Sequence, residues 1–110
     1  MNRIDNSQKI DCIIMKPRII VKCKLGQDWY TNDLEIYFVP DLYYPDYIEV
    51  ESYIMRELDG SELNIEEVVA ILYDKIMQEF SPKKLRIVDN VCSPKTHFSV
   101  SVIKGDLINE

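Results

Sequence analysis

The chain has 110 residues, of which 46% are hydrophobic and 29% charged, a composition typical of one globular domain and not of a disordered segment. The net charge of −6 argues against binding to a nucleic-acid backbone, which requires a basic surface, although a nucleobase-sized ligand could still occupy a local pocket. No stretch approaches the roughly 18 apolar residues of a membrane span, and the polar start of the chain is unlike a signal peptide. We therefore expect a cytoplasmic protein with no nucleic-acid or membrane partner.

The three cysteines, Cys12, Cys23 and Cys92, are an odd number without paired spacing, and His97 is the single histidine. We expect reduced thiols, as in cytosolic proteins, and no metal site.

The first half of the chain predicts a β-hairpin followed by a helix. After a polar tail over residues 1–9, residues 10–25 are rich in branched side chains and favour a strand that Pro17 restricts to an edge or a bulge, or splits in two. Residues 34–40 alternate as a second strand, so residues 26–33 would form the tip. The next segment, residues 40–46, is expected as a loop.

The first helix is expected to begin after Asp46, because Glu49 lies three residues further on, at the spacing of a capping box. Apolar residues then recur at helical spacing as far as Leu58, and Gly60 is the expected left-handed end of this helix.

The second half of the chain predicts a longer helix and a second hairpin. Asn64 and Glu67 repeat the capping-box spacing, and an apolar stripe runs from Ile65 to Phe80. Residues 84–91 and 97–103 are expected as antiparallel strands, followed by a tail over 104–110. The order β-β-α-α-β-β predicts one α+β domain over 1–110, a four-stranded antiparallel sheet with two helices on one face.

Four motifs stand in order within residues 12–103: Cys23 followed by Gly26-Gln27-Asp28-Trp29, Pro40 closing the next strand, Val50-Glu51-Ser52, and Ile65-Glu66-Glu67. Together with the order of elements, they resemble the tunnelling fold, and within it the NADPH-dependent 7-cyano-7-deazaguanine reductases of queuosine biosynthesis. The resemblance implies reduction of the nitrile to 7-aminomethyl-7-deazaguanine with NADPH, for queuosine in tRNA.

In that family the cysteine thiolate adds to the nitrile carbon and forms a thioimide, and a nearby acid supplies a proton. The resemblance thus implies Cys23 as the nucleophile, with a small buried thiol as the alternative. Asp28 matches the family acid if a gap replaces a missing proline, whereas a gap-free count places Tyr30 there. A loop aspartate forming a local turn is the other interpretation of Asp28.

The resemblance further implies that a glutamate at the start of the second helix holds the N–H edge of the base. We assign this role to Glu66, because Glu67 fits the capping box, although Glu66 could instead only complement the helix dipole. Glu51 and Ser52 are candidate substrate-binding residues, and a solvated helix face is their alternative.

The sequence departs from the family mainly on the cofactor side. Tyr53 replaces a lysine used near the cofactor phosphates, Ile65 replaces a histidine, and Lys95-Thr96-His97 replaces Arg-Gly-Gly. These departures favour a second hypothesis, a non-reducing relative that binds or transforms a purine- or pterin-like ligand. A third is a structural or interaction module. Uncovered sheet edges, which family members close in barrels of several subunits, predict a homo-oligomer with pockets at subunit interfaces.

Overall fold

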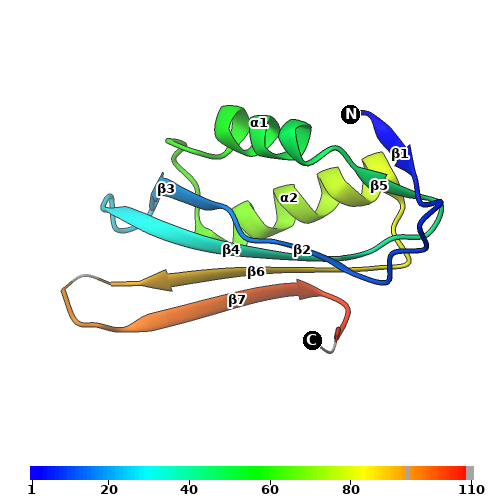
Figure 1. Ribbon diagram of the computed structural model, residues 1–110. Helices are drawn as coiled ribbons and strands as arrows, with labels where there is room; N and C mark the ends of the chain where they lie inside the picture. Colours follow the sequence, from blue (N-terminus) through cyan, green and yellow to red (C-terminus); the bar gives the residue numbers. More distant parts are fainter. Residues whose placement is uncertain (94, 109–110) are drawn as a thin grey trace.

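The computed structural model describes residues 1–93 and 95–108, and it has two layers, a β-sheet with two helices on one face (Figure 1). The elements in chain order are β1 (Arg3–Asp5), β2 (Ile13–Met15), β3 (Arg18–Lys22), β4 (Trp29–Val39), β5 (Tyr43–Pro45), α1 (Tyr47–Glu57), α2 (Ile65–Phe80), β6 (Lys84–Cys92) and β7 (Ser99–Gly105). The α+β class and the placement of both helices on one face are confirmed. In the described part of the chain, no helix has the length and apolarity needed to cross a membrane.

The main sheet is antiparallel, and β2 and β3 together form one of its edges beside β4. Both segments keep the same register, since Met15 lies opposite Ile36 and Arg18 opposite Asp33. Between them the carbonyl oxygen of Pro17 accepts a hydrogen bond from the backbone N–H of Leu34 at 2.9 Å. Proline has no N–H to return that bond, so it divides the strand without shifting it. The sheet therefore has four strand positions, as predicted.

The core lies between the helices and one face of the sheet. Strand β4 contributes Leu34, Ile36 and Phe38, and the ring of Phe38 meets that of Phe80 on α2 edge-to-face at 6.1 Å between centroids. Helix α2 buries Val68, Val69, Leu72, Ile76 and Phe80, and helix α1 buries Val50 and Ile54. These buried positions are the apolar stripes that predicted the helices.

Both helix starts are where the sequence placed them. The side chain of Asp46 accepts a hydrogen bond from the backbone N–H of Ile48 at 3.0 Å, so Asp46 is the N-cap of α1. Among the described residues, the Glu49 carboxylate does not accept from the backbone N–H of Asp46, as a capping box would require. It accepts from the backbone N–H of Asn2. At α2, the carboxylate of Glu67 accepts from the backbone N–H of Asn64 at 3.1 Å.

Two expected irregular segments contain strands, which corrects the prediction. Residues 3–5 of the expected tail pair with residues 43–45 of the expected loop, as β1 and β5. The side chain of Arg3 then lies over the ring of Tyr43, 5.6 Å from its centroid, and its Nε donates to the backbone carbonyl of Glu79 at 2.8 Å. Strands of three residues are too short to show an alternating pattern in the sequence, and each of these two depends on a partner far along the chain.

The hairpin boundaries also differ from the prediction. Strand β4 begins at Trp29, five residues before the expected start at residue 34, so the tip shortens to residues 23–28. Strand β7 runs over 99–105 instead of 97–103, and the C-terminal tail therefore begins at residue 106 and not at 104. In both cases polar residues, such as those between Trp29 and Leu34, pair in the sheet although their composition is typical of a turn.

Candidate functional site

The β3–β4 tip and the β6–β7 hairpin lie at the same end of the sheet (Figure 1). Residues of these two segments and of the start of α2 line a cavity of about 200 Å³. The residues that line it are Cys23, Tyr30, Ile65, Val91, Ser93, Phe98 and Val100. The side chain of Cys23 is partly buried, and Tyr30 and Ser93 are the hydroxyl-bearing residues of the lining. The site is thus a mostly apolar hollow that contains one thiol.

The strand register explains why these residues meet. Tyr30 pairs with Val21, a core residue of β3, and therefore belongs to the face of the sheet that the helices cover. Val91 pairs with Val100 on the same face, one hairpin away. Residues of the β6–β7 hairpin were not among the predicted site residues, because nothing in their alternating pattern distinguishes a pocket wall from a core strand.

Asp28 does not share the cavity that contains Cys23. Its carboxylate lies 3.5 Å from Nζ of Lys95, across the two hairpin tips, and it borders a smaller hollow of about 110 Å³. Tyr30 and Ser93 border both hollows. Of the two candidate proton donors, Tyr30, which the gap-free count from Cys23 selects, is the one that lines the cavity with Cys23.

The start of α2 presents two glutamates with different surroundings. Glu67 forms an ion pair with Lys24, 2.9 Å between Oε2 and Nζ, in addition to its bond with the N–H of Asn64. These two hydrogen bonds, that from Lys24 first, lower the pKa of Glu67. The side chain of Glu66 is exposed and has no hydrogen bond or ion pair within residues 1–93 and 95–108. Its carboxylate is therefore available at the helix start, one residue from the Ile65 side chain that lines the cavity.

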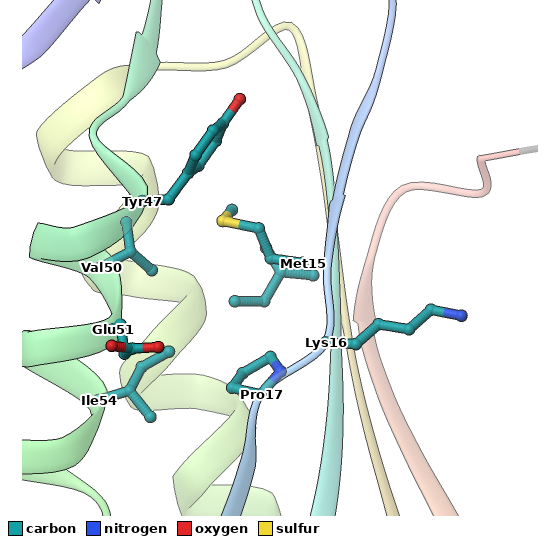
Figure 2. A pocket seen from close by; sticks show the side chains of 8 residues that line it. Met15, Lys16, Pro17, Tyr47, Val50, Glu51 and Ile54 are labelled. Carbon is teal, nitrogen blue, oxygen red and sulfur yellow. The ribbon is translucent and has the colours of Figure 1, made fainter.

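Glu51 and Ser52 lie elsewhere in the chain. Figure 2 shows the Glu51 carboxylate on α1 at a groove of about 260 Å³ between that helix and the edge strand, opposite Pro17. Cys23 is six residues beyond Pro17 along the edge, a span of roughly 20 Å for extended chain. Ser52 is exposed on the same helix. Within one chain, these two residues and Cys23 do not form one site.

Two residues on the expected cofactor side, Tyr53 and Lys95, have partners within the chain. Tyr53 is partly buried against the core, where burial raises its pKa, and Nζ of Lys75 lies 5.4 Å from the centroid of its ring. Its hydroxyl has no positive charge to replace the family lysine. Lys95 is paired with Asp28, and Lys24 with Glu67, so these two basic side chains have carboxylate partners. Within the described residues, no group of three or more potential metal ligands occurs.

Comparison with solved structures supports the same fold. An archaeosine synthase, QueF-Like, in its apo form superposes with a TM-score of 0.73 over 87% of this chain and 93% of the other, at 14% sequence identity. A protein assigned as a dihydroneopterin aldolase (FolB), from Vibrio cholerae O1 biovar El Tor str. N16961, superposes with a TM-score of 0.70 over 88% and 97%, at 19% identity. No protein-family model matches the sequence, and no curated protein is significantly similar to it. The chain has the tunnelling fold, and at these identities the likeness concerns the fold alone.

Proposed function

We propose that this protein binds a purine- or pterin-like base beside Cys23 and that the thiolate of Cys23 adds to a nitrile group on that base. The observation that carries the proposal is the shared cavity of Cys23 and Tyr30, next to the start of α2. The names of the two solved structures that share this fold, an archaeosine synthase and a dihydroneopterin aldolase, support a ligand of this kind.

Recognition of the base is assigned to Glu66. A carboxylate accepts two parallel hydrogen bonds, which suits the adjacent N–H donors of a guanine-like edge. Glu66 has this capacity unused, whereas both oxygens of Glu67 have partners. A neutral Glu66 side chain would lose the charge-assisted part of both bonds.

A second copy of the chain is needed to complete the pocket. The cavity of about 200 Å³ is smaller than typical ligand pockets of about 300–1,000 Å³. Strand β7 at one edge and β2 at the other border no further strand among the described residues, whereas the outward backbone groups of Ile20 and Lys22 on β3 already bond to residues 59–63. We propose that such edges pair between subunits of a homo-oligomer, which would enclose the base and supply Glu51 and Ser52 from a neighbour.

The addition step joins the thiolate, the nitrile and one proton. The sulfur of Cys23 forms a bond to the nitrile carbon, one π bond of the C≡N group becomes a nitrogen lone pair, and that nitrogen takes one proton to give the thioimide. Tyr30 lines the same cavity, and its hydroxyl is the group that we assign to deliver this proton. No other reactant is consumed.

The fate of the thioimide distinguishes two versions of the function. Reduction of 7-cyano-7-deazaguanine to 7-aminomethyl-7-deazaguanine with NADPH is the version that the sequence motifs favour. The core packing of Tyr53 and the Lys95–Asp28 ion pair instead favour the non-reducing relative, which binds or transforms the base without this cofactor. We adopt the non-reducing version, and the NADPH-dependent reductase is the alternative that the following experiment distinguishes from it.

Calorimetric titration with 7-cyano-7-deazaguanine, followed by addition of NADPH, tests both parts. We expect binding by the natural protein, weakening of about 10-fold or more in Glu66→Gln through loss of charge-assisted hydrogen bonds, and little change in Glu67→Gln. We expect no NADPH oxidation. Steady oxidation of NADPH, followed by its absorbance, would establish the reductase instead, and absence of binding would refute both versions.

A further inference from the structure

Two polar side chains are buried together in the helix-covered face of the sheet. Asn32 on β4 is 1% exposed and Asp89 on β6 is 0% exposed. The amide nitrogen Nδ2 of Asn32 donates a hydrogen bond to Oδ2 of Asp89 at 2.7 Å. The other oxygens, Oδ1 of Asn32 and Oδ1 of Asp89, are buried and have no partner among the described residues. A buried acceptor without a donor is costly, so this pair requires an explanation.

No cation in the described residues neutralises Asp89. The α2 side chains that cover the sheet are apolar, among them Val68 and Leu72. On β7, Val102 is the register partner of Asp89. Lys104, two residues further along the same face, lies over the ring of Tyr73, 5.0 Å from its centroid.

The third neighbouring element, β4, adds a negative charge. Asp33 follows Asn32 on that strand and is paired with Arg18 at 2.7 Å. Ionised Asp89 would thus be a buried carboxylate with an amide, a second carboxylate nearby and no counter-ion among the described residues, an unfavourable arrangement.

We propose that Asp89 and Asn32 form a neutral carboxylic acid–amide pair in the folded protein, a buried proton-binding site that acts as a pH-sensitive switch. A proton on Oδ1 of Asp89 donates to Oδ1 of Asn32, while Nδ2 of Asn32 donates to Oδ2 of Asp89. One proton thereby provides a partner for both orphaned oxygens. Burial, and secondarily repulsion from Asp33, raise the pKa of Asp89 to about 6 against the lowering effect of Asn32. A hydrogen bond made by the protonated form raises the pKa further.

The switch lies directly beside the candidate site. Asn32 is the register partner of Val91, and Val91 lines the cavity that contains Cys23. When Asp89 loses its proton, Oδ1 of Asn32 on β4 and Oδ1 of Asp89 on β6 are left without a hydrogen-bond donor among the described residues. The folded state is therefore more stable at low pH, because folded Asp89 retains a proton that the unfolded chain has lost. This extra stability is lost as the pH rises through the pKa of folded Asp89.

The test is denaturant unfolding between pH 4 and pH 8 with Asp89→Asn, which replaces the acid by an amide that can make the same two bonds. For the natural protein we expect the folding equilibrium constant to fall on the order of 100-fold more than for Asp89→Asn over this range. Asp74→Asn, at an exposed aspartate of α2, should follow the natural protein. Parallel curves for the natural protein and Asp89→Asn would overturn the proposal.

A second measurement uses only the natural protein and does not depend on whether a variant folds. The carboxyl carbon of Asp89 can be followed by NMR in the natural protein as the pH is raised. We expect its titration midpoint at about pH 6 or above. A midpoint near the ordinary aspartate value of about 4 would show an ionised carboxylate and overturn the acid–amide pair.

Discussion

The backbone N–H of Cys23 donates to the carbonyl oxygen of Asp28 at 2.9 Å, and this bond closes the tip of the first hairpin. Because the tip ends there, β4 begins at Trp29, and Tyr30 takes the position opposite Val21 on the helix-covered face. The same bond leaves the Asp28 side chain at the turn, where it meets Lys95 of the other hairpin. Of these two residues, Tyr30 lines the cavity that contains the thiol, and Asp28 does not.

If Tyr30 delivers the proton to the nitrile nitrogen, removing its hydroxyl slows the addition while the pocket keeps its shape. We expect Tyr30→Phe to slow thioimide formation about 100-fold, at the low end of general-acid effects, and Asp28→Asn to leave the rate nearly unchanged. Stopped-flow absorbance with 7-cyano-7-deazaguanine measures both rates. A large effect of Asp28→Asn with normal Tyr30→Phe would assign the proton to Asp28 instead.

The Lys24–Glu67 ion pair predicts a pH dependence of stability. The pKa of Glu67 is lowered in the folded protein, first by Lys24 and then by the N–H of Asn64. Its contribution is therefore present above the ordinary glutamate pKa and is lost as the pH falls through the lower, folded value. Between pH 5 and pH 3 we expect the natural protein to lose more stability than Glu67→Gln in urea titrations. Equal losses would show that the pair contributes nothing.

Two glycines with positive φ differ in what surrounds them. Gly105 has φ of 111°, and a Cβ there would overlap the backbone carbonyl of Leu85, whereas Gly60 has φ of 75° and open space around it. We expect Gly105→Ala to lower the free energy of unfolding by about 2 kcal/mol or more, from strain and displacement of the end of β7. Gly60→Ala should lower the free energy of unfolding by only about 1 kcal/mol, the cost of a left-handed backbone conformation for a residue with a Cβ atom. Equal losses in thermal unfolding would contradict the packing at Gly105.

The proposed pairing of sheet edges between subunits can be tested with proline. The bonds from Ser93 to Phe98 and from Asp106 to Leu85 fix even-numbered β7 residues as those bonded to β6, so the N–H of Ser101 points outward. We expect Ser101→Pro to keep the fold and to reduce the oligomer to smaller species in light scattering. Val102→Pro, which removes an inward donor, should destabilise the sheet itself. An unchanged mass for Ser101→Pro would exclude this edge.

Local patterns in the sequence predicted the elements that are specified locally. The span of α2 follows from Asn64, a continuous apolar stripe and Ser81-Pro82, and the structure has the same limits. The divided edge strand follows from the missing N–H of Pro17. Each of these signals lies within a few residues of the feature that it specifies.

Features that depend on distant partners could not be predicted in this way. Strand β1 needs β5, some forty residues away, and polar Asn32 belongs to a strand because Asp89 lies 57 residues further on. The same applies to the candidate site. Cys23 was identifiable as a candidate, but the choice between Asp28 and Tyr30 depended on a hydrogen bond across the hairpin tip and on Lys95 of another hairpin.

Intact-protein mass spectrometry after incubation with 7-cyano-7-deazaguanine is the most direct test of the proposed chemistry. We predict a mass increase equal to one ligand per chain, absent in Cys23→Ala and retained in Cys12→Ala and Cys92→Ala, whose exposed thiols serve as matched controls. An unmodified protein, or an adduct that survives in Cys23→Ala, would contradict the assignment of Cys23 as the nucleophile.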